Sequence, residues 1–300
     1  MQGPGLNRFV AAIALVTSLS CLHAQTPSFD GSRALGHIRE LVAIGPRVAG
    51  EPGAQRAREY IKKQLAAIGL DAQEQPFEGV TPLGPVKMVN LRVTLPGANT
   101  SGGRLIISGH YDTKRFREFQ FVGANDGGSS AAFLLEAARV LKDRKNALPI
   151  ELLFFDGEEA VVDWTGTDHT YGSQYYVDAA KKEGTLGKIR ALILVDMIGD
   201  RDLRILRESG STAWLTDTIW AAAKRLKRPE FADESTPIED DHQPFLHAGV
   251  PAVDLIDLDY PEWHQAGDTL DKVSAGSLQA VGDVLLAALP AIEQRLVEKR

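Results

Sequence analysis

Two acidic residues, Glu158 and Glu159, follow an apolar run that is typical of a buried strand. The run covers residues 150–155, so the turn after it places both carboxylates at the carboxyl end of the strand. Open α/β sheets bind their ligands at this edge. Neighbouring carboxylates repel each other unless a cation or a shared proton stabilises them. The pair therefore suits a site where one carboxylate binds a metal and the other is a general base, although a solvated acidic turn would look the same.

Four more residues of metal-ligand type lie just after strand-like runs or just before helix-like ones. They are His110, Asp126, Asp196 and His264. A single histidine after a strand is usually structural, and an aspartate at a helix start is usually an N-cap. Together with Glu159, however, these residues form a set of nitrogen and oxygen ligands without sulfur. Such a set suits zinc in a catalytic site that keeps one position open.

Hydrophobic periodicity predicts the elements that position these residues. Helical patterns cover 31–69 with a break at 45–46, then 129–141, 174–182, 212–226 and 277–298, and strand-like runs cover 73–77, 86–95, 105–108, 150–155, 191–195 and 252–256. Strands that alternate with helices predict a mixed, mostly parallel sheet between two helical layers. We expect a single-domain α/β protein, a three-layer α/β/α sandwich, over residues 25–300. The loop 114–123 carries three aromatic residues and is expected to border a substrate cleft.

The first 24 residues have the pattern of a secretory signal peptide, with Arg8 ahead of an apolar run. We expect an exported protein, periplasmic or extracellular; lipoprotein anchoring through Cys21 is a weaker alternative. Removing residues 1–24 leaves 32 basic residues of the 33 against 40 acidic ones, a net charge of −8. This acidity excludes a basic nucleic-acid surface. No thiol chemistry remains, because Cys21 is the one cysteine. No later run suggests a transmembrane segment, and we expect a monomer.

The motifs GHYDT, GANDGGS, FFDGEE, LVDMIGD and WHQAGDT occur in this order along the chain. This series resembles the co-catalytic zinc aminopeptidases of peptidase family M28 and their relatives, the animal-type glutaminyl cyclases. The resemblance covers nearly the whole chain after residue 24 and implies an eight-stranded mixed sheet between helices. For an aminopeptidase it implies two zinc ions bridged by Asp126. His110 and Asp196 would complete one site, Glu159 and His264 the other, and Glu158 would be the general base.

Three residues favour the cyclase branch of this resemblance. Asp240 precedes Asp241-His242 where the peptidases carry a small residue. Trp164 lies in a segment that resembles the cyclase loop whose tryptophan lines the substrate pocket, and Trp263, just before the metal histidine, is also cyclase-like. An acidic loop and packing tryptophans are the alternative explanations. The segment 268–271, Asp-Thr-Leu-Asp, matches the peptidases instead. In the cyclase interpretation one zinc lies on Asp126, Glu159 and His264, and Glu158, Asp196 and Asp240 are catalytic.

The resemblance implies a zinc-dependent glutaminyl-peptide cyclotransferase, an acyltransferase that converts N-terminal glutamine to pyroglutamate and releases ammonia. Its partners would be peptides or proteins with a free N-terminus, preferably glutamine. The alternative is a secreted two-zinc aminopeptidase that hydrolyses N-terminal residues. A non-enzymatic binding protein on the same scaffold is disfavoured because Glu158 and every ligand position are filled. Zinc content, one ion or two, and substrate separate the two enzymes.

Overall fold

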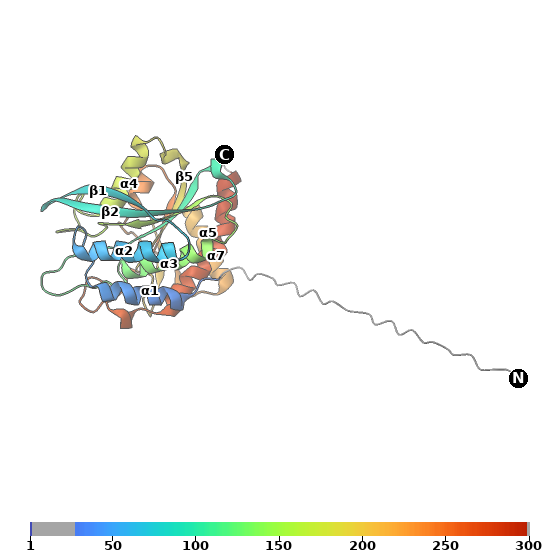
Figure 1. Cartoon of the computed structure of the whole chain (residues 1–300), viewed down its shortest axis with the longest axis horizontal. Helices are drawn as coiled ribbons and strands as arrows, with labels where there is room; N and C mark the ends of the chain where they lie inside the picture. The colour runs from blue at the N-terminus through green and yellow to red at the C-terminus, as the bar shows by residue number, and fades with distance from the viewer. Residues whose placement is uncertain (2–27, 299–300) are drawn as a thin grey trace.

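The computed structural model of the chain describes Met1 and residues 28–298 (Figure 1). The predicted cleavage after residue 24 and Cys21 lie outside the described residues, and so does all but Met1 of the predicted signal peptide. Residues 28–298 form a layered α/β domain, as expected.

A six-stranded sheet lies at the centre in the order β1-β2-β4-β3-β5-β8. Its strands are β1 (Gln73–Thr81), β2 (Gly84–Leu95), β4 (Ile150–Phe155), β3 (Arg104–His110), β5 (Ile189–Asp196) and β8 (Ala252–Ile256). The pairs β1·β2 and β2·β4 are antiparallel, whereas β3·β4, β3·β5 and β5·β8 are parallel. The sheet is therefore mixed and mostly parallel, as predicted.

Helices cover both faces of the sheet (Figure 1). One face carries α1 (Gly31–Ile44), α2 (Pro52–Ala67), α3 (Gly128–Leu141), α5 (Ala213–Leu226) and α7 (Ala275–Glu298). The other face carries α4 (Tyr171–Lys182) and the short α6 (Gln243–His247). Short 3₁₀ turns lie at Thr100–Gly102, Leu186–Lys188 and Leu270–Lys272. Local sequence sets several helix starts: the Asp30 side chain accepts hydrogen bonds from the first turn of α1, and Pro52 begins α2.

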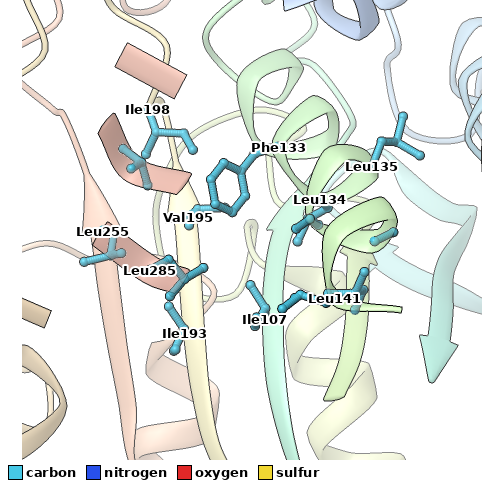
Figure 2. Close-up of a cluster of buried hydrophobic side chains, with 14 of the residues drawn as sticks. Ile107, Phe133, Leu134, Leu135, Leu141, Ile193, Val195, Ile198, Leu255 and Leu285 are labelled. Atoms are coloured by element: carbon cyan, nitrogen blue, oxygen red, sulfur yellow. The ribbon is translucent and has the colours of Figure 1, made fainter. Parts of the chain in front are cut away.

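The central strands are apolar at nearly every position because both of their faces are buried. Ile107 of β3 and Ile193 of β5 pack toward α3 and α7, close to Phe133 and Leu285 (Figure 2). The alternate residues, such as Leu192, pack toward α4 and α6 on the other face. The two cores hold the strands rigidly and so fix the positions of their carboxyl ends.

One implied detail differs from the structure. Eight strands are present among the described residues, but β6 (Ile205–Glu208) and β7 (Phe231–Thr236) form a separate two-stranded parallel sheet. Residues of the loop between β6 and α5 occupy the outer edge of β8. The Ser211 hydroxyl accepts a hydrogen bond from Asp254 N, and the Thr212 hydroxyl accepts one from Ala252 N. These side chains satisfy the strand edge, and the six-stranded sheet ends there.

Helix α7 is the one described helix whose length and hydropathy would suit a membrane span, although none was expected there. Its apolar residues, among them Leu278, Val281 and Leu285, are buried in the core against α1, α3 and α5. Core packing therefore accounts for its apolar character.

Candidate metal centre and active-site pocket

The candidate residues meet at one edge of the sheet because parallel strands end there together. His110 is the last residue of β3, Asp196 is the last residue of β5, and Glu158 and Glu159 follow β4. Asp126 lies just before α3, in a loop that crosses the same edge. The strand-end pattern thus brings residues separated by up to 86 positions into contact, as the His110–Asp196 pair shows.

Asp126 lies between the two histidines and directs one carboxylate oxygen toward each. Its Oδ1 is 3.2 Å from His110 Nε2, and its Oδ2 is 3.4 Å from His264 Nε2. His110 Nε2 is also 3.1 Å from Asp196 Oδ1, and His264 Nε2 is 3.3 Å from Glu159 Oε2. Two three-residue clusters of ligand type result, with Asp126 common to both.

The buried oxygens of these clusters lack the partners that buried polar atoms normally have. Asp126 Oδ2 and both Glu159 carboxylate oxygens accept no hydrogen bond from any described residue. An unpaired buried carboxylate is costly unless a cation is bound to it. One carboxylate shared by two His-and-carboxylate sets is also a donor arrangement that zinc prefers. The residues present therefore fit zinc, most completely at Asp126, Glu159 and His264.

A pocket of about 420 Å³ opens directly onto this centre. Its floor is acidic and is formed by five carboxylates, Asp126, Glu158, Glu159, Asp196 and Asp240. Its walls are largely apolar and include Trp164, Trp263, Ile238 and Met197. The volume is within the range of small-molecule pockets. Of the predicted site residues, only His110 does not line the pocket; it lies behind the floor and is 1% exposed.

Three aromatic rings contact the His264 imidazole. The Trp263 ring stacks on the His264 imidazole with centroids 4.5 Å apart. Phe116 and Phe121 contact the same imidazole edge-on at 5.9 and 6.0 Å. The loop 114–123 therefore borders the cleft as expected, since its Lys114 also lines the pocket.

Comparison with known proteins agrees with this geometry. The model of peptidase family M28 matches residues 90–289, which is two thirds of the chain. The chain belongs to peptidase family M28. Among curated M28-like relatives, the glutaminyl-peptide cyclotransferase of Drosophila melanogaster is 31% identical over 268 residues, covering 79% of this chain and 75% of the relative. By that measure the chain is also a member of the glutaminyl-peptide cyclotransferases, the branch that the sequence predicts.

Solved structures support the same branch. The glutaminyl cyclase of an Acidobacteriales bacterium superposes with a TM-score of 0.85 and 38% identity, covering 95% of this chain and all of that one. A structure from Bacteroides thetaiotaomicron described as a leucine aminopeptidase precursor gives a TM-score of 0.79 and 26% identity, covering 88% and 98%. The predicted α/β architecture is thus confirmed as the fold shared by glutaminyl cyclases and aminopeptidases of this family.

Two further aspartates fix the M28 loops that carry the candidate ligands. The Asp112 carboxylate accepts hydrogen bonds from the backbone N–H groups of Glu158 and Glu159 at 3.2 and 3.3 Å. The Asp268 carboxylate accepts from Asn125 N at 2.8 Å and Asp126 N at 3.0 Å. Both aspartates are almost fully buried. Each therefore orients a ligand-bearing turn through its backbone, and Asp112 Oδ1 also lies 3.4 Å from His110 Nδ1.

Arg47 links the loop segments around the same ligands. Its guanidinium is fully buried and donates hydrogen bonds to the carbonyls of Tyr111, Val122 and Gly123 at 2.6–2.8 Å. It also reaches the Asp126 carbonyl at 3.4 Å. Burial lowers the pKa of Arg47 to about 10, opposed by surrounding carboxylates such as Asp268. The charge stays buried because it holds three loop segments together.

Backbone strain is concentrated at the site. Four described non-glycine residues have positive φ, and three of them, Thr170, Met197 and His264, lie at or beside the pocket. Such conformations persist where surrounding contacts enforce them, and they cluster at functional sites. Gly127, next to Asp126, has φ of 71°, and a Cβ there would lie 2.3 Å from the Asp112 carbonyl oxygen. The ligand loop therefore requires glycine at this position.

Burial and neighbouring carboxylates raise the pKa values of acidic residues at the pocket floor. Burial raises the pKa of Glu158 well above its ordinary value; His110 opposes this, and Glu159 and Asp240 add to it. Burial also raises the pKa of Glu159 to about 7 and that of Asp126 to about 6. A bound cation would favour the ionised forms of all three groups. Perturbed carboxylates in a cleft are typical of catalytic sites.

No role for Asp112, Asp268 or Arg47 was predicted from the sequence. Both aspartates lie inside quoted motifs, GHYDT and WHQAGDT, so their proximity to the ligand histidines was the available signal. Arg47 follows Gly45-Pro46, which indicates only a helix break. In the acidic loop ahead of His242, Asp240 and Asp241 are both buried.

Proposed function

We propose that this protein is a zinc-dependent glutaminyl-peptide cyclotransferase that converts N-terminal glutamine to pyroglutamate. One observation carries the proposal: Glu158, Asp240, Trp164 and Trp263 line a single pocket of about 420 Å³ with the candidate zinc ligands at its floor. Membership of the glutaminyl-peptide cyclotransferases supports the same reaction. The partners are peptides or proteins with a free N-terminal glutamine.

The reaction joins two ends of one residue. The α-amine of the glutamine attacks its own γ-amide carbon, a new C–N bond forms, and the bond to the amide nitrogen breaks to release ammonia. Glu158 is placed to accept the proton lost by the amine and to return it to the departing nitrogen. Its raised pKa suits a group that both takes and gives a proton.

Asp196 and Asp240 supply hydrogen-bond acceptors for nitrogen groups of the substrate. Both line the pocket, and burial raises the pKa of Asp240 well above its ordinary value, with Asp254 and Asp196 adding to the effect. Together the two acids would hydrogen-bond the substrate amine or the departing ammonia.

Asp126, Glu159 and His264 would hold the zinc ion in this mechanism. Zinc, when bound there, would polarise the γ-amide carbonyl as a Lewis acid. Trp164 and Trp263 would hold the glutamine in a curled conformation, which brings the amine close to the amide carbon. The aromatic walls contribute proximity and exclude water, which would otherwise compete as a nucleophile.

An aminopeptidase activity is the second candidate, and one observation favours it. His110, Asp126 and Asp196 form a second cluster of ligand type, and two zinc ions would suit hydrolysis by an activated water. In this structure, however, Asp196 Oδ1 also accepts hydrogen bonds from Ser130 Oγ and from its neighbouring backbone N–H. The second cluster is thus already partly satisfied by the protein, which favours one zinc.

The test is ammonia release from glutaminyl dipeptides by purified, zinc-loaded protein. The proposal predicts release that stops with a chelator, returns with zinc, and is lost in Glu158→Gln although that variant still binds one zinc ion. Zinc counted by mass spectrometry of the native protein separates one ion from two. Activity in Glu158→Gln equal to that of the wild type would contradict the assigned base.

We also propose that the protein is exported and acts as a monomer. The apolar segment after Arg8 supports export. One chain brings together all the candidate ligands, Glu158, Asp240 and both tryptophans, so a monomer would suffice for the proposed reaction. Intact mass of the exported protein would test cleavage after residue 24, and a retained lipid on Cys21 would contradict it.

A further inference from the structure

A second cavity lies directly behind one wall of the active-site pocket. It has a volume of about 290 Å³ and is lined by polar residues of α4, α6 and the loop before α4, including His169, Gln174, Lys181 and His247. Glu239 and Asp240 line both this cavity and the active-site pocket. The two spaces are therefore neighbours that share part of a wall.

The rest of that wall is a pair of stacked rings. The Trp164 indole and the His169 imidazole are almost parallel, with centroids 4.3 Å apart and 10° between their planes. Trp164 lines the active-site pocket and His169 does not, whereas His169 lines the second cavity and Trp164 does not. Each ring therefore faces one space, and the contact between them separates the two.

We infer that His169 is a positioning residue whose imidazole braces the Trp164 indole, so that the two rings form the partition that shapes the substrate pocket. The inference rests on the proposed function in one respect, that Trp164 is a wall of the glutamine site. Without a ring at 169, the indole would have open space behind it and could rotate away from the pocket.

His169 itself is firmly held, as a brace must be. It is 5% exposed; its Nδ1 lies 3.1 Å from the Thr170 hydroxyl, and its carbonyl accepts from Gln174 Nε2 at 2.8 Å. Thr170 has a positive φ of 51°, and its N–H donates to the Glu158 carbonyl at 2.7 Å. The imidazole is thus fastened through one residue to the backbone of the proposed general base.

The loop that carries Trp164 is held in shape by Asp168, the residue before His169. The Asp168 carboxylate accepts hydrogen bonds from three consecutive backbone N–H groups, residues 161–163, at 2.8–3.1 Å, and from the Tyr171 hydroxyl at 2.6 Å. These bonds close the loop between Val161 and Asp168 into a compact turn. The loop therefore presents Trp164 to His169 in one defined orientation.

The charged and titratable groups around His169 come from three elements. Glu239, ahead of α6, lies 3.7 Å from His169 Nε2, and the others are Asp168 of its own loop, Asp178 and Lys181 of α4, and His247 of α6. Burial lowers the pKa of His169, and Glu239 and Asp168 oppose that effect. The imidazole is consequently neutral at neutral pH, when it stacks as a flat, uncharged ring.

The test compares His169→Ala, which removes the ring, with His169→Phe, which keeps a flat ring but cannot be protonated. His37→Phe is the matched control, because His37 is a mostly buried histidine on α1 that contacts Tyr60 rather than a tryptophan. We expect His169→Ala to raise KM for a glutaminyl peptide about 2- to 10-fold, the range of an aromatic pair, with kcat unchanged. His169→Phe should restore the wild-type KM.

Tryptophan emission gives a readout that does not depend on activity or zinc. A protonated imidazole in contact with an indole quenches its fluorescence, so acidification should lower wild-type emission in a step that is smaller in His169→Phe. Trp263 also stacks on a histidine, but this contribution is common to both proteins. The His37→Phe control should keep the step.

Identical emission profiles for the wild type and His169→Phe would overturn the inference, as would an unchanged KM in His169→Ala. Failure of the proposed function looks different. In that case no variant releases ammonia from a glutaminyl peptide, while the emission step still reports whether His169 contacts Trp164.

Discussion

The Asp268 carboxylate accepts a hydrogen bond from the backbone N–H of Asp126 at 3.0 Å, across 142 residues of sequence. Asp126 is the carboxylate shared by both candidate metal clusters. Asp268, in the loop between β8 and α7, therefore fixes the orientation of the loop that carries Asp126. Groups that orient metal ligands commonly change metal affinity when they are altered.

Asp268→Asn should lower zinc affinity about 10- to 100-fold. In this variant an amide NH₂ group replaces one carboxylate oxygen. It would point at a backbone N–H group that donates to that oxygen in the wild type. Competition with a fluorescent zinc chelator measures the affinity. Asp271→Asn, three residues later and exposed, is the matched control and should leave the affinity unchanged. Equal losses in both variants would contradict an orienting role for Asp268.

Arg47→Lys should lower the free energy of unfolding by about 2–4 kcal/mol. A lysine cannot reproduce the planar fork that reaches the carbonyls of residues 111, 122 and 123, and each buried carbonyl left unpaired costs about 1–3 kcal/mol. Urea unfolding of the metal-free protein measures the loss. Arg39→Lys, on the exposed side of α1, should change stability by less than about 0.5 kcal/mol. Similar values for the two variants would show that the buried fork is unimportant.

Without metal, the protein should be more stable near pH 5 than near pH 8. Burial raises the pKa of Glu159 from 4.5 to about 7 and that of Asp126 from 3.8 to about 6, so the folded state binds more protons than the unfolded state between those values. Stability therefore falls as pH rises through this window. Asp257, whose pKa burial raises to about 7, acts in the same direction.

Bound zinc should reduce this pH dependence, because it keeps Glu159 and Asp126 ionised while Asp257 is unaffected. Thermal unfolding across pH, with and without zinc, measures both slopes. Parallel slopes for the metal-free and zinc-loaded protein would contradict the placement of zinc on these carboxylates.

Asp240→Asn should lower kcat by about 10²-fold, the lower end of what a positioned acid–base group contributes, without loss of zinc. Asp240 lines the pocket but belongs to neither ligand cluster, so its effect should fall on turnover rather than on metal content. Ammonia release and zinc content are measured on the same sample. A variant that loses zinc along with activity would show that Asp240 supports the metal instead.

The strand-end residues were predictable because their position follows from a general rule of parallel sheets. His110, Asp196 and Glu159 each follow an apolar run that both cores bury, and the carboxyl ends of such strands meet at one edge. The comparisons confirm the cyclase branch, whose signals were Asp240 and the two tryptophans. The individual site roles of those residues stay predictions.

The strands β6 and β7 and the helix α6 were not predicted. Strand β7, Phe231–Thr236, has apolar residues only at its first two positions and is largely exposed, so it lacks the alternation that indicates a strand. Helix α6 has five residues, too few for a periodic pattern. In both cases tertiary contacts, rather than local sequence, determine the conformation.

The contacts that support the site also could not be predicted from the sequence. Arg47 acts on carbonyls 64–79 residues away, and any residue type presents the same carbonyl. His169 contacts Trp164 through a turn whose shape depends on Asp168 and on the strained Thr170. Such contacts are set by loop geometry, which residue types and their spacing do not specify.

The most direct test of the proposed function offers two substrates to one zinc-loaded sample, a glutaminyl dipeptide and a leucyl arylamide. We predict that mass spectrometry finds the dipeptide converted to its pyroglutamyl form with release of ammonia, while the arylamide stays intact, and that Glu158→Gln does neither. Cleavage of the arylamide without formation of pyroglutamate would contradict the proposal and identify the protein as an aminopeptidase.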